Sequence, residues 1–212
     1  RKMLDEAGFP DAVISASSDL DEYLIESLKL QGAKITSWGV GTNLITSADN
    51  PAFGGVYKLA AVYDEEQKDY IPKIKLSENS EKVTNPGNKT IFRVYEKESG
   101  KIKADIIALV GETFPEDKDL LLFDPVEPWK KTKMKAGTFT IREMMIPVFK
   151  DGECCYESPK VMEIRDYCKK EQESLWDEAR RLVNPHKVYV DLSKKLYDLK
   201  MQLLDKVNEG KE

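Results

Sequence analysis

Residues 12 to 42 have the pattern of a βαβ unit, which restricts this part of the chain to an α/β fold. Ala12–Ala16 is a short apolar run typical of a strand. Ser18–Asp21 matches a helix-capping box, and leucines at helical spacing follow it until Gly32 supplies a stop signal. Residues 34–38 then return to strand character. A strand, a helix and a strand within about 30 residues match one βαβ unit.

A glycine loop follows the second predicted strand and indicates an anion site. The glycines of Gly39–Thr42 can turn successive backbone amides toward one point, and the Thr42 hydroxyl adds a donor. Ser17–Asp19 follows the first strand, where a helix start attracts negative charge. Since α/β proteins bind phosphates at the carboxyl ends of parallel strands, we predict a phosphate site there. The alternative is a tight turn beside an ordinary helix cap. The candidate phosphate-binding residues are Ser17, Ser18, Asp19, Gly39, Val40, Gly41 and Thr42.

Charge and apolar runs exclude several classes of protein. The 212 residues carry a net charge of −5, so no basic field would attract nucleic acid or an anionic membrane. The longest apolar runs, such as residues 106–110, are too short to span a bilayer. Cys154, Cys155 and Cys168 match neither a disulfide framework nor a CxxC metal pattern, and we expect reduced thiols in a cytoplasmic protein.

The remaining chain changes character twice. Residues 55–110 are rich in strand-like runs and include a hairpin turn at Glu98–Lys101. From about residue 129 the pattern becomes helical. Pro159 opens a helix whose apolar stripe continues to Leu182, and a second amphipathic helix follows Asp191 or Ser193. We expect both stripes to be buried in a core.

Several blocks, in order along nearly the whole chain, resemble the nicotinate phosphoribosyltransferase family. They are Ser17–Glu22 (SSDLDE), Trp38–Thr46 (WGVGTNLIT), Asn50–Leu59 (NPAFGGVYKL), Lys75–Glu78 (KLSE), Asn85–Lys89 (NPGNK) and Pro185–Ser193 (PHKVYVDLS). The second and third blocks are the most specific. At the position of Ser18 the family commonly has glycine or asparagine, residues that tolerate a left-handed backbone.

The resemblance implies a type II phosphoribosyltransferase fold, an irregular α/β barrel joined to a strand-rich domain. This chain would be its C-terminal portion. We expect residues 1–60 to end the barrel and carry the phosphate-binding loops, residues 61–128 to form a strand-rich mixed segment, and residues 129–212 to be mainly helical.

The resemblance also implies an activity. Enzymes of this family join nicotinate to phosphoribosyl pyrophosphate, with ATP and Mg²⁺, giving nicotinate mononucleotide for NAD biosynthesis. The loop at Gly39–Thr42 would hold the 5′-phosphate of the ribosyl donor, and Asp19, Asp21 and Glu22 are candidates for placing Mg²⁺. The family's catalytic histidine, base-stacking aromatic and main phosphate-binding arginine belong to an upstream half that we expect to be missing. A homodimer is expected, and the segment alone should be inactive.

Two other classes stay open. The chain could be a non-catalytic assembly module, or part of another phosphate-binding barrel enzyme. The sequence does not separate nicotinate from nicotinamide as the substrate. We expect His186, the only histidine, to lie in a surface loop, Lys58 to be a solvated strand lysine, and Trp129 and Trp176 to be packing residues.

Overall fold

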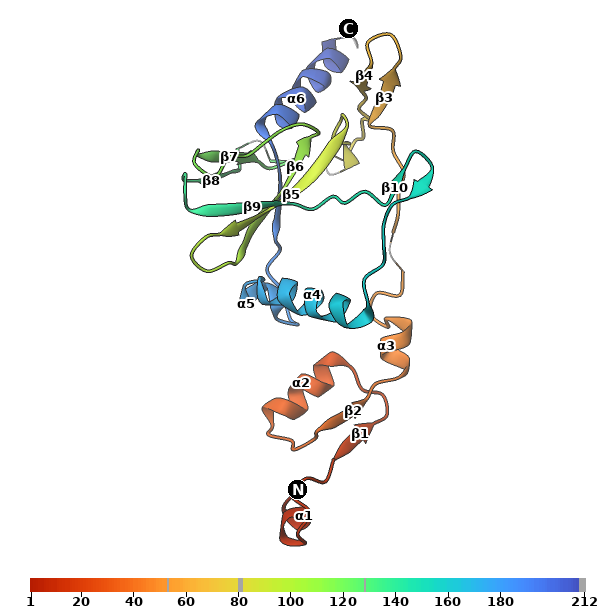
Figure 1. Ribbon diagram of the computed structural model, residues 1–212, viewed down its shortest axis with the longest axis vertical. Helices are drawn as coiled ribbons and strands as arrows, with labels where there is room; N and C mark the ends of the chain where they lie inside the picture. The colour runs from red at the N-terminus through yellow and green to blue at the C-terminus, as the bar shows by residue number, and fades with distance from the viewer. Residues whose placement is uncertain (53, 80–81, 128, 210–212) are drawn as a thin grey trace. The chain divides into compact units, whose positions relative to one another are not determined.

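The computed structural model describes residues 1–52, 54–79, 82–127 and 129–209, and it divides into two compact units (Figure 1). The units are Arg1–Val56 and Tyr57–Glu212. Both contain helices and strands, so the chain is a mixed α/β protein. No helix within the described ranges is long and apolar enough to cross a membrane.

The first unit contains the predicted βαβ arrangement. Its elements in chain order are α1 (Lys2–Glu6), β1 (Ser15–Ser17), α2 (Glu22–Leu30), β2 (Ser37–Gly39) and α3 (Thr42–Thr46). Strands β1 and β2 pair in parallel, with Ser15 opposite Ser37. Gly32 adopts a φ of +80° just after α2, which confirms the predicted stop, because a side chain is strained in that conformation.

The second unit is built around a six-stranded mixed sheet. The sheet strands are β5 (Lys89–Glu96), β6 (Ile102–Leu109), β7 (Leu120–Phe123), β8 (Lys131–Met134), β9 (Phe139–Glu143) and β12 (Tyr189–Leu192), in the order β8-β7-β12-β6-β5-β9. Separate hairpins are β3 (Ala61–Asp64) with β4 (Asp69–Pro72), and β10 (Phe149–Lys150) with β11 (Glu153–Cys154). The helices are α4 (Val161–Glu173), α5 (Asp177–Arg180) and α6 (Lys194–Glu209). The predicted hairpin joining β5 and β6 is confirmed.

One face of this sheet forms the core. Burial alternates along β6, so that every second side chain from Ile102 to Ala108 is buried. The core cluster is Val94, Ala104, Ile106, Ala108, Leu120, Leu122, Met134 and Phe139. Outside this cluster, helix α6 buries Leu196 completely and stacks Tyr197 on Phe123, with ring centroids 4.6 Å apart. The stripe predicted to be buried is therefore buried at Leu196 and only partly buried farther along the helix.

Strand β12 lies between β6 and β7, although it comes from near the C-terminal end of the described chain. It pairs in parallel with β6 and antiparallel with β7. Its last residue leads into Ser193, whose hydroxyl accepts a hydrogen bond from the Leu196 amide at 3.2 Å. Ser193 thus caps α6, whereas Asp191 is buried and accepts a hydrogen bond from the Thr132 hydroxyl. Of the two residues predicted as possible caps, Ser193 is the one that caps the helix.

The prediction of one helix from Pro159 to Leu182 is wrong. Helix α4 ends at Glu173, and α5 begins only at Asp177. The backbone carbonyls at the break accept hydrogen bonds from residues at the start of β6. Lys101 donates through Nζ to the carbonyls of residues 173 and 175, and the Ile102 amide donates to the Ser174 carbonyl. These bonds occupy acceptors that a continuous helix would use for its own amides.

The expectation that the α4 stripe is buried is also wrong. Val161 is 79% exposed and Ile164 is 51% exposed. The apolar spacing produced a helix, but within the described ranges these two side chains stay largely open to solvent. Trp129 is 75% exposed rather than packed, and Trp176 is partly exposed but fixed by a hydrogen bond. In the region expected to be rich in strands, residues 55–110, regular strand begins only at Ala61, where β3 pairs with β4.

Candidate phosphate-binding site

The ends of β1 and β2 meet closely in the first unit. Ser17 lies opposite Gly39 in the parallel register. A Cβ atom placed on Gly39 would lie 3.2 Å from the Ser17 Cβ, closer than most such contacts. Glycine at this position therefore allows the two strand ends, and the loops that follow them, to approach each other.

The loop after β1 has an unusual backbone. Ser18 and Asp19 have φ angles of +82° and +45°, in the left-handed region that few residues other than glycine and asparagine adopt readily. Ser18 therefore occupies a conformation that glycine or asparagine would adopt more readily. The loop turns there before α2 begins.

Ser18 does not cap α2, which corrects the capping-box prediction. The cap is Asp21, which is extended and accepts a hydrogen bond through Oδ1 from the Leu24 amide at 2.7 Å. A carboxylate thus occupies part of the positive end of this helix. The start of α2 offers less to an external anion than the sequence indicated.

The loop after β2 leads directly into α3. Gly41 is the residue before the helix, and its carbonyl accepts hydrogen bonds from the amides of residues 44 and 45. Thr42 is the first helical residue and is exposed. Asn43 joins the two loops, since its side-chain amide donates to the carbonyls of Asp19 and Leu20 at 3.4 Å and 3.2 Å. The candidate residues after both strands are thus held at one edge of the strand pair.

The hollow beside these loops has the wrong charge for a phosphate. It has a volume of about 320 Å³, and Val40 and Asn43 line it together with Asp21, Glu22 and Asp49. Three carboxylates disfavour an anion there. The strand ends themselves, at Ser17 and Gly39, are exposed. Nowhere in the described ranges do three or more histidine, cysteine or acidic side chains gather as a metal-binding group.

Two lysines of the second unit donate to backbone carbonyls. Lys58 donates through Nζ to the Lys82 carbonyl at 3.1 Å, and Lys89 donates to the Gly87 carbonyl at 2.6 Å. Burial lowers the pKa of the half-buried Lys89 ammonium. His186 is exposed in the segment between α5 and β12, as expected. The described contacts do not bring Lys58, Lys89 and His186 together into one anion site.

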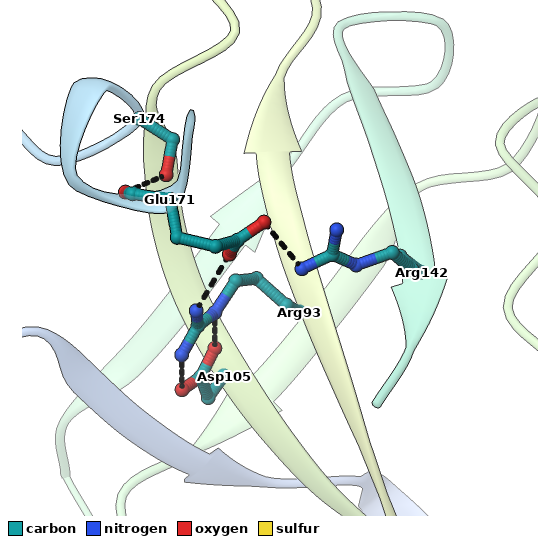
Figure 2. Close-up of polar contacts among 5 residues, drawn as sticks. All are labelled: Arg93, Asp105, Arg142, Glu171 and Ser174. Carbon is teal, nitrogen blue, oxygen red and sulfur yellow. Dashed lines mark hydrogen bonds and ion pairs between the residues drawn. The ribbon is translucent and has the colours of Figure 1, made fainter. Parts of the chain in front are cut away.

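Figure 2 shows the partners of Arg93, which lies on β5. Its guanidinium binds both carboxylate oxygens of Asp105 at 2.8 Å, and Nη1 contacts Glu171 at 3.2 Å. Glu171, on α4, also accepts from Arg142 at 2.9 Å. The hydrogen bond to Asp105 raises the pKa of Arg93, so this guanidinium stays charged. These contacts fix α4 to the sheet.

Sequence reasoning did not identify this ion-pair network. A signal existed in the strand register, where Arg93 lies opposite both Asp105 on β6 and Arg142 on β9. Like charges directly opposite each other destabilise a sheet unless a carboxylate lies between them. Glu171 supplies that carboxylate, but from a helix 78 residues away in the sequence, which no local pattern reveals.

Comparisons with known proteins agree on one family. The protein-family model named nicotinate phosphoribosyltransferase C-terminal domain matches residues 88–200 of this chain. The nicotinate phosphoribosyltransferase of Bacillus subtilis is 42% identical over 98% of this chain, and that of Caenorhabditis elegans is 34% identical over 89%. The chain spans 41% and 32% of the lengths of these relatives.

A solved structure has a similar fold. The crystal structure of human nicotinic acid phosphoribosyltransferase superposes with a TM-score of 0.67 at 24% identity. The match covers 96% of this chain and 36% of the human chain.

Proposed function

The chain belongs to the nicotinate phosphoribosyltransferase family, and we propose on that basis that it is the C-terminal portion of an enzyme making nicotinate mononucleotide. The reaction would join the ring nitrogen of nicotinate to C1 of phosphoribosyl pyrophosphate. The bond from C1 to the pyrophosphate oxygen would break, and pyrophosphate would leave with the electron pair. Family membership also argues against the alternative that the chain is part of another type of phosphate-binding barrel enzyme.

The role proposed for this segment is to hold the 5′-phosphate of the ribosyl donor. The observation that supports it is the meeting of two loops, at Ser17–Asp19 and Gly39–Thr42, on one edge of a parallel strand pair. The Thr42 hydroxyl and the first amides of α3 would donate to phosphate oxygens. Such fixed donors would hold the ribosyl group in position while the bonds at C1 change. Arg1–Val56 would then be the end of the barrel.

The use of ATP and Mg²⁺ is proposed for the whole enzyme and not for this segment alone. On this chain, the Asp21 carboxylate already accepts the Leu24 amide, and the described residues offer no metal-binding group around Asp19 or Glu22. Mg²⁺ and ATP would instead be held with the help of residues outside this segment. The substrate pair, the upstream half of the enzyme and the homodimer belong to the same proposal.

The first test measures synthesis of nicotinate mononucleotide by the 212-residue chain alone, supplied with nicotinate, ATP, Mg²⁺ and phosphoribosyl pyrophosphate. We expect no turnover above background, because the chain spans less than half of its relatives. A chimera that adds the unmatched portion of the Bacillus subtilis relative is expected to be active with nicotinate. Turnover by the chain alone would contradict the proposed division of roles, and a folded but inactive chimera would favour the assembly-module alternative.

The second test changes Thr42→Ala in that chimera. Loss of one hydrogen bond to a phosphate should raise the apparent KM for phosphoribosyl pyrophosphate by about tenfold or more, with a smaller effect on the KM for nicotinate. Thr46→Ala is the matched control, because the Thr46 hydroxyl donates to the Thr42 carbonyl within α3. An unchanged donor KM in Thr42→Ala would reject the phosphate assignment without affecting the family membership.

A further inference from the structure

A hollow of about 450 Å³ lies in the second unit, between the start of β6, helix α5 and the segment that leads into β12. Its walls are mainly apolar. Trp176 and Tyr189 provide aromatic surface, and His186 lies between them in the sequence and lines the same space. None of the candidate phosphate-binding residues of the first unit contributes to this hollow.

The aromatic walls are held in place by hydrogen bonds and ring contacts. Trp176 donates through Nε1 to the Ile102 carbonyl at 2.8 Å, which fixes the orientation of the indole. The His186 amide donates to the Glu178 carbonyl at 2.8 Å, and its ring meets that of Tyr189 edge-on at 5.9 Å. A ligand entering this hollow would find a largely preformed surface, which lowers the entropic cost of binding.

The charged groups of the hollow are mostly positive. Lys103, Arg181 and Lys187 line it, against the single carboxylate of Glu178. Lys103 contacts Glu96 at 2.8 Å and lies 5.3 Å from the centre of the Trp176 ring. Arg181 uses only its Nε, which donates to the Asn184 carbonyl at 2.8 Å. In the described part of the chain, its terminal amino groups and the exposed Lys187 donate to no protein acceptor.

From this geometry we propose that the hollow binds a ligand in which an aromatic base is joined to a phosphate, about the size of a nucleoside monophosphate. The base stacks against Trp176 and Tyr189, and the phosphate contacts Arg181 and Lys187. The volume lies within the range of small-molecule sites and exceeds what a single ring would fill. Apolar walls with a few convergent cations suit a ligand that is flat at one end and anionic at the other. The inference does not depend on the function proposed for the Gly39–Thr42 loop.

Calorimetric titration of the 212-residue chain with AMP tests this proposal, with adenosine and ribose 5-phosphate as separate arms. AMP is expected to bind more tightly than either part, because it engages both the aromatic wall and the cations. Trp176→Leu should weaken AMP and adenosine alike by about tenfold, since a base stacked on an aromatic ring contributes about 1–3 kcal/mol. Lys187→Gln should weaken AMP about threefold and leave adenosine unchanged, as an exposed ion pair contributes less than about 1 kcal/mol.

Two controls make the result specific. Lys195→Gln removes a similarly exposed lysine from α6 and should leave AMP binding unchanged. Thr42→Ala should also leave it unchanged, whereas a loss in that variant would place the nucleotide at the strand ends instead. Absence of AMP binding, or equal effects of Lys187→Gln and Lys195→Gln, would overturn the proposal.

Discussion

Replacing Glu171 by glutamine tests whether the ion-pair network of Figure 2 holds α4 on the sheet. Glutamine keeps the size of the side chain but removes the charge shared by Arg93 and Arg142. The Glu171 side chain is only 17% exposed, so water replaces little of what is lost. Asp105 still compensates Arg93 in the variant, and no fully unpaired buried charge is left behind.

The magnitude follows from the two contacts. The Arg93 contact, at 3.2 Å between groups that are 23% and 17% exposed, should contribute about 1–2 kcal/mol as a charge-assisted hydrogen bond. Arg142 is 38% exposed, so its contact is closer to a surface pair worth about 0.5 kcal/mol. We therefore expect Glu171→Gln to lower the free energy of unfolding by about 2 kcal/mol and the Tm of this unit by about 4–8 °C.

Urea and thermal unfolding, followed by circular dichroism, measure this difference. Glu173→Gln is the matched control on the same helix, since Glu173 is 64% exposed and 4.0 Å from Lys169. It should change stability by less than about 0.5 kcal/mol. If the two variants have the same stability, the network does not hold α4, and the reasoning from Figure 2 is refuted.

Substitutions of Gly87 and Asp191 test the interior of the second unit, with Gly137 as a control. Gly87→Ala should destabilise the chain by about 2 kcal/mol or more, because Gly87 has a φ of +89° and its new Cβ would lie 2.7 Å from Leu109 Cδ2. Gly137→Ala, at a φ of +76° in open space, should cost only about 1 kcal/mol, and equal losses in urea unfolding would contradict the packing argument. Burial raises the pKa of Asp191 above its ordinary 3.8, against the opposing hydrogen bond from Thr132. A raised pKa means that the folded state binds the proton more tightly, so the stability due to Asp191 is present at low pH and lost as pH rises through the folded pKa. Asp191→Asn should therefore gain stability relative to the unmodified chain between pH 4 and pH 7, and a parallel pH dependence of the two would exclude this explanation.

Residue types alone predicted part of the geometry of the candidate site. Glycines after β2 and serines after β1 predicted that two loops would meet, and the register of Ser17 with Gly39 confirms that they do. Whether a phosphate binds there stays a prediction. The role of Asp21 as the cap was not predictable, because two polar residues in the same short string could each cap the helix. The left-handed turn at Ser18 and Asp19 decided between them.

The sequence by itself determined the elements that depend on neighbouring residues. The βαβ unit, the turn at Glu98–Lys101 and the helix stop at Gly32 follow from backbone preferences within a few positions, and the family follows from the blocks that the chain shares with it. Only the tertiary structure decided how distant segments combine. Strand β12 joined the middle of a sheet formed by strands about 80 residues earlier. Hydrogen bonds to the start of β6 lie at the break in the helix predicted from Pro159. Strand pairing and ion pairs depend on which backbone groups and charges meet in space, and a linear pattern of apolar residues does not contain that information.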